Sequence, residues 1–138
     1  MAAVQPQPAP QPKGKTSVQV RVIDALGELF FGAQIDFSLR GASVGSVTDS
    51  AGEARITYPE EGAGLEVSVS ASGATQSRLL APGIDITPGG TRNLVDFKMP
   101  VIRSTNVPPR PVAKCPDGTA GQPCVDCYIN GSTIRVCG

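Results

Sequence analysis

The sequence contains no histidine and no tryptophan, and only 4% of its residues are aromatic. Histidine is the commonest acid–base catalyst and a common metal ligand, so its absence excludes a Ser–His–Asp triad. A Gly-x-Gly-x-x-Gly fingerprint is also missing. Gly14-Lys15-Thr16 spells the end of a phosphate loop, but Ala9 stands where the leading glycine belongs, and no helix pattern follows. We therefore expect no enzymatic activity and no cofactor.

Long apolar runs and an excess of one charge are missing as well. No apolar stretch approaches the 18 residues that a membrane-spanning helix needs. Twelve basic and twelve acidic residues cancel, and no basic patch stands out. These features predict neither insertion into a membrane nor binding to nucleic acid. The first residues, MAAVQP, lack the basic start and apolar stretch of a secretory signal.

The carboxylates offer two alternatives to a structural role. The adjacent pair Glu60–Glu61 resembles the acidic pair of a glycosidase only in composition, and on a polar loop we interpret it as solvated. Asp24 and Asp49 each precede a glycine by three residues. We expect them to hydrogen-bond the backbone of their own turns, with a calcium site between them as the less favoured alternative.

Short segments with alternating apolar and polar residues make up the middle of the chain. Alternation places one face of a strand in a core and the other in solvent, as in antiparallel sheets. Sixteen glycines and thirteen prolines supply turns. We predict strands near residues 17–24, 33–40, 46–48, 53–58, 65–71, 75–80 and 91–99. The fold class is therefore all-β, an antiparallel β-sandwich of six to seven strands.

Four segments within this region carry a family resemblance. They are VRVIDALG at residues 20–27, GAQI at 32–35, TDSAGEARI at 48–56 and VSVSASG at 67–73. In this order they resemble the carboxypeptidase regulatory-like domains, which share a transthyretin-like, immunoglobulin-like sandwich. The resemblance covers about residues 16–100. It implies a non-catalytic accessory, spacer or assembly module.

The chain divides into four predicted regions. Residues 1–15 form a Pro/Gln-rich arm whose alternating prolines favour an extended, polyproline-like conformation. Residues 16–102 form the sandwich domain, and residues 103–114 form a proline-rich linker. Residues 115–138 form a small hairpin that cysteines hold together.

The hairpin is predicted from its turn. Asn-Gly at 130–131, flanked by β-forming residues, is the strongest signal for a two-residue type I′ turn. Pairing outward from it places Asp126 opposite Arg135, which supports the register. The same register places Cys124 opposite Cys137 in a non-hydrogen-bonded pair, where Cα atoms lie about 4.5 Å apart, as a disulfide allows.

By elimination, the second disulfide joins Cys115 to Cys127; the two other pairings stay open as alternatives. Zinc held by Cys115, Cys124, Cys127 and Cys137 is another alternative, although only Cys124-x-x-Cys127 has knuckle spacing. Because a hairpin this short buries no core of its own, covalent bonds are the expected means of stabilising it. Disulfides indicate an oxidising location, which for a chain without a visible signal favours a cell surface or a virion.

We predict a non-catalytic structural subunit of an extracellular or virion assembly, such as a decoration protein, a tail or fibre component, or a surface filament. Its partners would be other copies of itself or neighbouring subunits. The arm would lie along one neighbour, and the hairpin would clip onto another. The alternative is an accessory binding module directed at carbohydrate or a cell surface. That alternative has only Tyr58 and Tyr128 to stack against a sugar ring.

Overall fold

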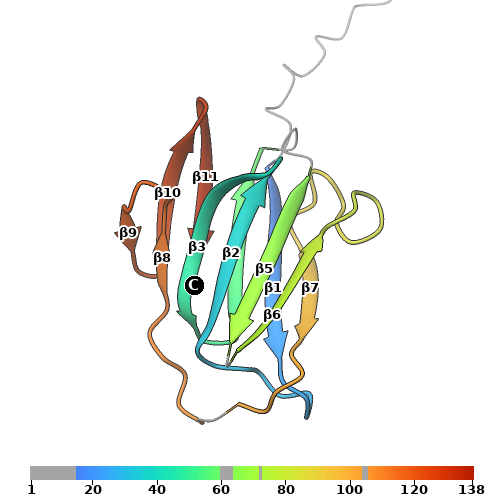
Figure 1. Cartoon of the computed structure of the whole chain (residues 1–138). Coiled ribbons are helices and arrows are strands. Elements are labelled where there is room, and N and C mark those ends of the chain that lie inside the picture. Colours follow the sequence, from blue (N-terminus) through green and yellow to red (C-terminus); the bar gives the residue numbers. More distant parts are fainter. Residues whose placement is uncertain (1–14, 60–63, 72, 104–105) are drawn as a thin grey trace, which may run out of the picture.

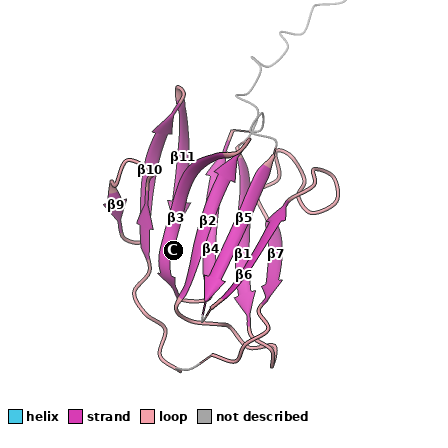
Figure 2. Cartoon of the chain, viewed as in Figure 1, coloured by secondary structure: helices cyan, strands magenta, loops and turns pink. Residues whose placement is uncertain are grey.

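The structure, a computed structural model, describes residues 15–59, 64–71, 73–103 and 106–138. Glu60 and Glu61 lie outside these residues, as does nearly all of the arm. Every regular element of the described part is a strand (Figure 2). The strands are β1 Thr16–Ile23, β2 Ala33–Leu39, β3 Ala42–Ser50, β4 Glu53–Tyr58, β5 Leu65–Ala71, β6 Ala74–Leu79, β7 Asn93–Lys98, β8 Val112–Lys114, β9 Ala120–Gly121, β10 Cys124–Ile129 and β11 Ser132–Cys137.

The strands form two stacked sheets (Figure 1). The first, sheet A, has the order β10-β11-β4-β1-β7, and the second, sheet B, has the order β6-β5-β2-β3-β8-β9. All pairings are antiparallel except β1 with β7. Between β6 and β7 the chain crosses from sheet B to sheet A, and β7 runs in the same direction as β1. The predicted all-β sandwich is confirmed.

Alternating residues of both sheets form one core. Val18, Val20 and Val22 of β1 are fully buried, as the alternation predicts. Across the core, sheet B contributes Ile35 and Phe37, which are also fully buried. Burial of this kind stabilises a fold by about 1.5–3 kcal/mol for each large aliphatic or aromatic side chain. The period-two pattern of the sequence therefore matches the inward faces of the strands.

The C-terminal region differs from its predicted role as a separate hairpin after a linker. Val112–Lys114, expected in the linker, forms β8 and pairs with β3. Strand β11 pairs with β4 through Arg135↔Thr57, Val136↔Ile56 and Cys137↔Arg55. Ile134 and Val136 belong to the same core cluster as β1. The hairpin therefore extends the sandwich, because its inward face adds apolar side chains that a detached hairpin would leave in water.

Asp24, immediately after β1, organises the turn that follows. Its carboxylate is fully buried and accepts hydrogen bonds from the backbone N–H groups of Leu26 (2.8 Å), Glu28 (3.0 Å) and Arg103 (3.3 Å). Burial opposes ionisation, but these N–H groups and the positive charge of Arg103 hold the pKa of Asp24 below its ordinary value. The predicted turn role of Asp24 is confirmed.

In the β3–β4 turn, the corresponding role belongs to Ser50 and not to Asp49. The Ser50 hydroxyl accepts from Gly52 N–H at 3.0 Å and donates to the Glu53 carbonyl at 3.3 Å. Asp49 is exposed and has a φ of 51°. Ser50 is fully buried, so its side chain, and not that of Asp49, faces the turn.

We expect Asp24→Asn to lower the melting temperature at pH 7 by roughly 5–10 °C, because a neutral amide is a weaker acceptor for three backbone donors. The folded-state pKa is lowered, so the stabilisation by this carboxylate is full above its unfolded-state pKa and is lost as the pH falls below about 4. Melting curves from pH 7 to pH 2 should therefore converge for the two proteins at acid pH. Asp49→Asn is the control, with little expected change at any pH. A constant difference across the whole pH range would contradict the prediction.

Candidate interaction surfaces

The two sides of the sandwich differ in how their edges are covered. On one side, β8 adds to β3 in sheet B and β11 adds to β4 in sheet A. The segment from Val112 to Gly138, here called the strap, therefore covers both edges that β3 and β4 would otherwise expose. On the other side, sheet A ends at β7 and sheet B ends at β6 (Figure 1).

Two disulfides hold the strap. Cys115 follows β8 in sheet B, and it bonds to Cys127 on β10 in sheet A, so this disulfide links the two sheets. Cys124–Cys137 joins β10 to β11 at a Cα–Cα distance of 4.1 Å. Both predicted pairings are present. Since all four sulfurs are in disulfides, no thiolate is left for the zinc alternative.

The hairpin itself follows its predicted register. The pairs run from Ile129↔Ser132 to Cys124↔Cys137. Asn130 and Gly131 have φ values of 51° and 78°, as a type I′ turn requires. Arg135 lies 3.5 Å from Asp126 across the two strands. Local turn chemistry was therefore sufficient to predict this element.

A close approach joins the strap to β3. A Cβ atom at Gly45 would lie 2.6 Å from Val136 Cγ2 and 3.2 Å from the Lys114 carbonyl oxygen. Contacts below 3.0 Å are essentially never made by real Cβ atoms. Glycine at this position of β3 therefore lets β11 pack directly on sheet B.

On the opposite side, side-chain interactions join the two sheets. Gln76 of β6 donates to the Lys98 carbonyl of β7 at 2.7 Å. The Arg78 guanidinium lies 5.2 Å from the centre of the Phe97 ring and 3.6 Å from Asp85. These contacts join the margins of the two sheets through side chains, without a strand bridging them.

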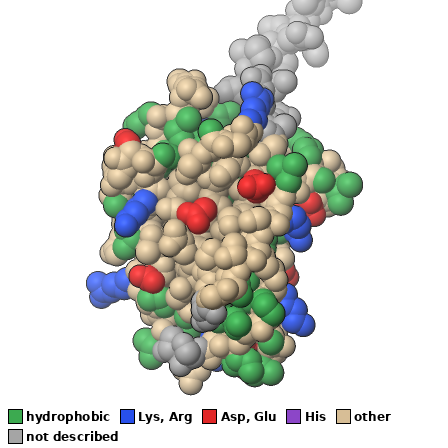
Figure 3. Space-filling view, viewed as in Figure 1, with side chains coloured by type: hydrophobic (Ala, Val, Ile, Leu, Met, Phe, Trp, Pro, Cys, Tyr) green, Lys and Arg blue, Asp and Glu red, His purple; other side chains and the backbone are tan. Residues whose placement is uncertain are grey.

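The outer face of sheet B is rich in hydroxyl groups. Ser77 donates to Ser68 at 3.0 Å, and Ser70 and Thr75 share a hydrogen bond of 3.3 Å. Figure 3 shows this face from the viewpoint of Figure 1: charged side chains are few over the strands, and apolar ones gather at its margins. The face is therefore polar up to its border at β6, with the carboxylates of Asp36 and Glu66 among its hydroxyl groups.

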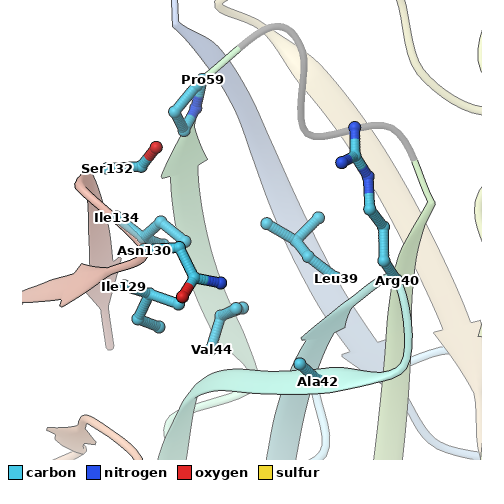
Figure 4. Close-up of a pocket in the computed structure, with 9 residues that line it drawn as sticks. All are labelled: Leu39, Arg40, Ala42, Val44, Pro59, Ile129, Asn130, Ser132 and Ile134. Atoms are coloured by element: carbon cyan, nitrogen blue, oxygen red, sulfur yellow. The ribbon is translucent and has the colours of Figure 1, made fainter.

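A hollow of about 400 Å³ lies at the end of the sandwich where the hairpin turns (Figure 4). Ile129 and Ile134 line it from the strap, and Leu39 and Val44 line it from β2 and β3. Asn130, Ser132, Arg40, Ala42 and Pro59 complete its wall. The hollow is a gap between two hairpin tips, and its lining is mostly apolar with polar groups at its margin.

The two tyrosines are in different environments. Tyr58 is buried in the core, and burial raises its pKa to about 12. Tyr128 on β10 is 80% exposed. The sugar-stacking alternative therefore keeps one of its two predicted aromatic residues.

Thr16 opens β1, so Lys15-Thr16 leads into a strand and not into the helix that a phosphate loop requires. Among the described residues, no three His, Cys, Asp or Glu side chains gather as a metal site would require. That part of the chain also has no helix long and apolar enough to cross a membrane.

Comparison with protein-family models, with curated proteins and with solved structures finds no match to this chain.

Proposed function

We propose that this protein is a non-catalytic structural subunit of an extracellular or virion assembly, joined to its neighbours through the N-terminal arm. The observation that carries the proposal is the asymmetry of the sandwich. One side is closed by a disulfide-bonded strap, whereas the other ends in β6, which is paired only with β5 among the described strands. An unpaired strand edge is a surface prepared for another chain.

The role of the hairpin changes relative to the sequence-based hypothesis. The sequence predicts that the hairpin clips onto a neighbouring subunit. In the structure, β11 is already paired with β4 of its own sandwich. The arm is therefore the connector that we propose, and the strap serves as a fixed closure.

The two disulfides support an oxidising, extracellular setting, because bonds of this kind persist outside the cytosol. Within that setting, we place the protein at a cell surface or in a virion. The resemblance to carboxypeptidase regulatory-like domains, which serve as accessories and spacers, agrees with a role without chemistry. That family assignment stays a prediction from the quoted residues.

We expect the oxidised full-length chain to form a defined oligomer and a chain beginning at Thr16 to be monomeric. The deletion removes no strand residue, because β1 starts at Thr16. Size-exclusion chromatography with light scattering measures both masses, and circular dichroism checks that the shortened chain keeps its β structure. If both chains stay monomeric up to high concentration, the proposal is contradicted.

A binding module directed at carbohydrate or a cell surface is the second candidate, and the exposed ring of Tyr128 favours it. Such a module would remain monomeric and bind a glycan saturably. Tyr128→Ala would abolish that binding without changing the melting temperature. Glycan-array screening of the full chain decides between the two candidates.

A further inference from the structure

We propose that residues 5–12 of one copy of this chain add as a strand to the outer edge of β6 in a second copy. The inference rests on the proposed function, since it names the surface that receives the arm. Two features support it: the direction of the backbone hydrogen-bonding groups along β6 and the spacing of the prolines in the arm.

One hydrogen bond shows which residues of β6 direct their backbone N–H and C=O groups to β5. Just beyond the strand, Leu80 N–H donates to the Leu65 carbonyl of β5 at 2.9 Å. In an antiparallel pair, alternate residues direct both backbone groups to the same neighbour. Even-numbered residues of β6 therefore face β5. The N–H and C=O groups of Thr75, Ser77 and Leu79 point away from it, to the open edge.

Of the usual protections against strand pairing, this edge has one inward-facing charge, on Arg78, and no proline, lysine or bulge. Exposed edges in natural proteins are blocked by proline, by lysine, by bulges or by a covering segment. β6 has the sequence ATQSRL, and its single charge, on Arg78, lies over the Phe97 ring. Its pairing with β5 has no register shift.

The other edges are shorter or partly engaged. β9 has only two residues. On β7, the Lys98 carbonyl already accepts a hydrogen bond from Gln76. β10 is tied to the segment after β8 by the Cys115–Cys127 disulfide. Among the described strands, β6 therefore offers the best edge for an added strand.

The arm has the complementary property. Pro6, Pro8, Pro10 and Pro12 stand at every second position. In an extended strand, all four prolines direct their missing N–H groups to one edge, and the residues between them, Gln5, Gln7, Ala9 and Gln11, direct their N–H groups to the other. Such a strand has one competent edge. It can pair with an open sheet through this edge, and its other edge, which has no proline N–H groups, cannot pair with a further strand. Each β6 edge is therefore limited to one arm.

Side-chain direction agrees with the same pairing. Residues directly opposite in a ladder place their side chains on the same face. The glutamines and Ala9 would therefore lie beside Thr75 and Ser77 on the hydroxyl-rich outer face, and the prolines would face inward, beside Gln76 and Arg78. Eight arm residues span about 26 Å, which is enough to cover the roughly 20 Å of β6.

The geometry at the root of the arm favours a second copy over the same molecule. Thr16 begins in sheet A, whereas β6 belongs to sheet B. The connection from β6 to β7 lies against this root: Gly89 N–H donates to Thr16 Oγ1 at 2.8 Å, and Ser17 N–H donates to the Gly90 carbonyl at 2.9 Å. An arm folding back onto its own β6 would have to pass this connection, and the arm of a neighbour would not.

The decisive variant removes the every-second-position spacing of the prolines without changing the composition of the arm. Exchanging residues 7 with 8 and 11 with 12 (Gln7→Pro, Pro8→Gln, Gln11→Pro, Pro12→Gln) blocks both edges of the arm and keeps its length, charge and proline content. We expect the dissociation constant of the oligomer to rise at least tenfold, by analytical ultracentrifugation. The matched control, Gln7→Ala with Ala9→Gln, reorders the arm but keeps the spacing of the prolines. It should assemble like the original chain.

The second measurement locates the contact on the unmodified chain. Amide hydrogen exchange of Thr75, Ser77 and Leu79 should slow by at least about tenfold between dilute monomer and assembled protein. Assembly that survives the changed proline spacing, with these amides unprotected, would overturn this inference and leave assembly through the arm standing. A full chain that stays monomeric would overturn both. Protection of these amides in a monomer would show the arm on its own β6 and overturn the choice of a second copy.

Discussion

Replacing Cys115 and Cys127 together with alanine is expected to lower the free energy of unfolding by about 3 kcal/mol, the chain-entropy value for a loop of this size. The disulfide closes a loop with a sequence separation of 12. Both cysteines are buried, and alanine leaves no unpaired polar group in their place. Urea denaturation followed by circular dichroism measures the change.

The same variant should also free the strap locally. Cys115–Cys127 joins the segment after β8 to β10, so its loss removes the covalent link between the two sheets on the closed side. The amides of β8 should then exchange faster relative to those of β1. The comparison variant, Cys124→Ala with Cys137→Ala, removes a link within one hairpin and should leave β8 protected. Equal exchange of β8 in both variants would contradict the role assigned to the first disulfide.

Gly45→Ala is expected to destabilise the protein by about 1–3 kcal/mol, as overpacking of a core does. The added methyl group would meet Val136 Cγ2 at 2.6 Å, and the φ of 155° at Gly45 lies outside the range that alanine adopts readily. Ser46→Ala, one residue along the same strand, should change stability by no more than about 0.5 kcal/mol. Thermal and urea denaturation measure both.

A double-mutant cycle tests whether Val136 is the cause. Val136→Ala alone removes buried methyl groups and should itself destabilise the strap. In the Gly45→Ala, Val136→Ala protein, the smaller side chain makes room for the new methyl group. The double variant should therefore lose less stability than the sum of the two single losses, by about 0.5 kcal/mol or more. Strict additivity would show that backbone strain at Gly45, and not the contact with β11, determines the loss.

These predictions separate the two sides of the molecule. Changes in the strap act on stability, because its residues belong to the core cluster and its disulfides restrict the unfolded chain. Changes in the arm should act on association and leave the melting temperature unchanged, since deleting residues 1–15 removes no strand residue. Measuring stability and mass together for each variant therefore distinguishes a folding defect from a loss of contact.

The sequence by itself determined most features that depend on local chemistry, although it assigned to Asp49 the turn role that Ser50 has. Alternation fixed the inward faces of β1, β2 and β5, because the side-chain period of a strand is two. Asn130-Gly131 fixed the register of the hairpin, and the register fixed Cys124–Cys137, because a two-residue turn leaves one way to pair the flanking strands. The turn role of Asp24 followed from its position before Gly27.

Only the tertiary structure decided how distant segments combine. β8 and β9 have three and two residues, too few for a period to be read; pairing with β3 defines β8, and pairing with β8 defines β9. Nothing in the sequence around Gly45 indicates that the Val136 side chain, ninety-one positions later, occupies the space that a side chain at position 45 would need. The attachment of β11 to β4, and with it the contrast between a closed and an open side, depends on burial across the whole sandwich. Long-range pairing of this kind is set by the shared core, which no local pattern contains.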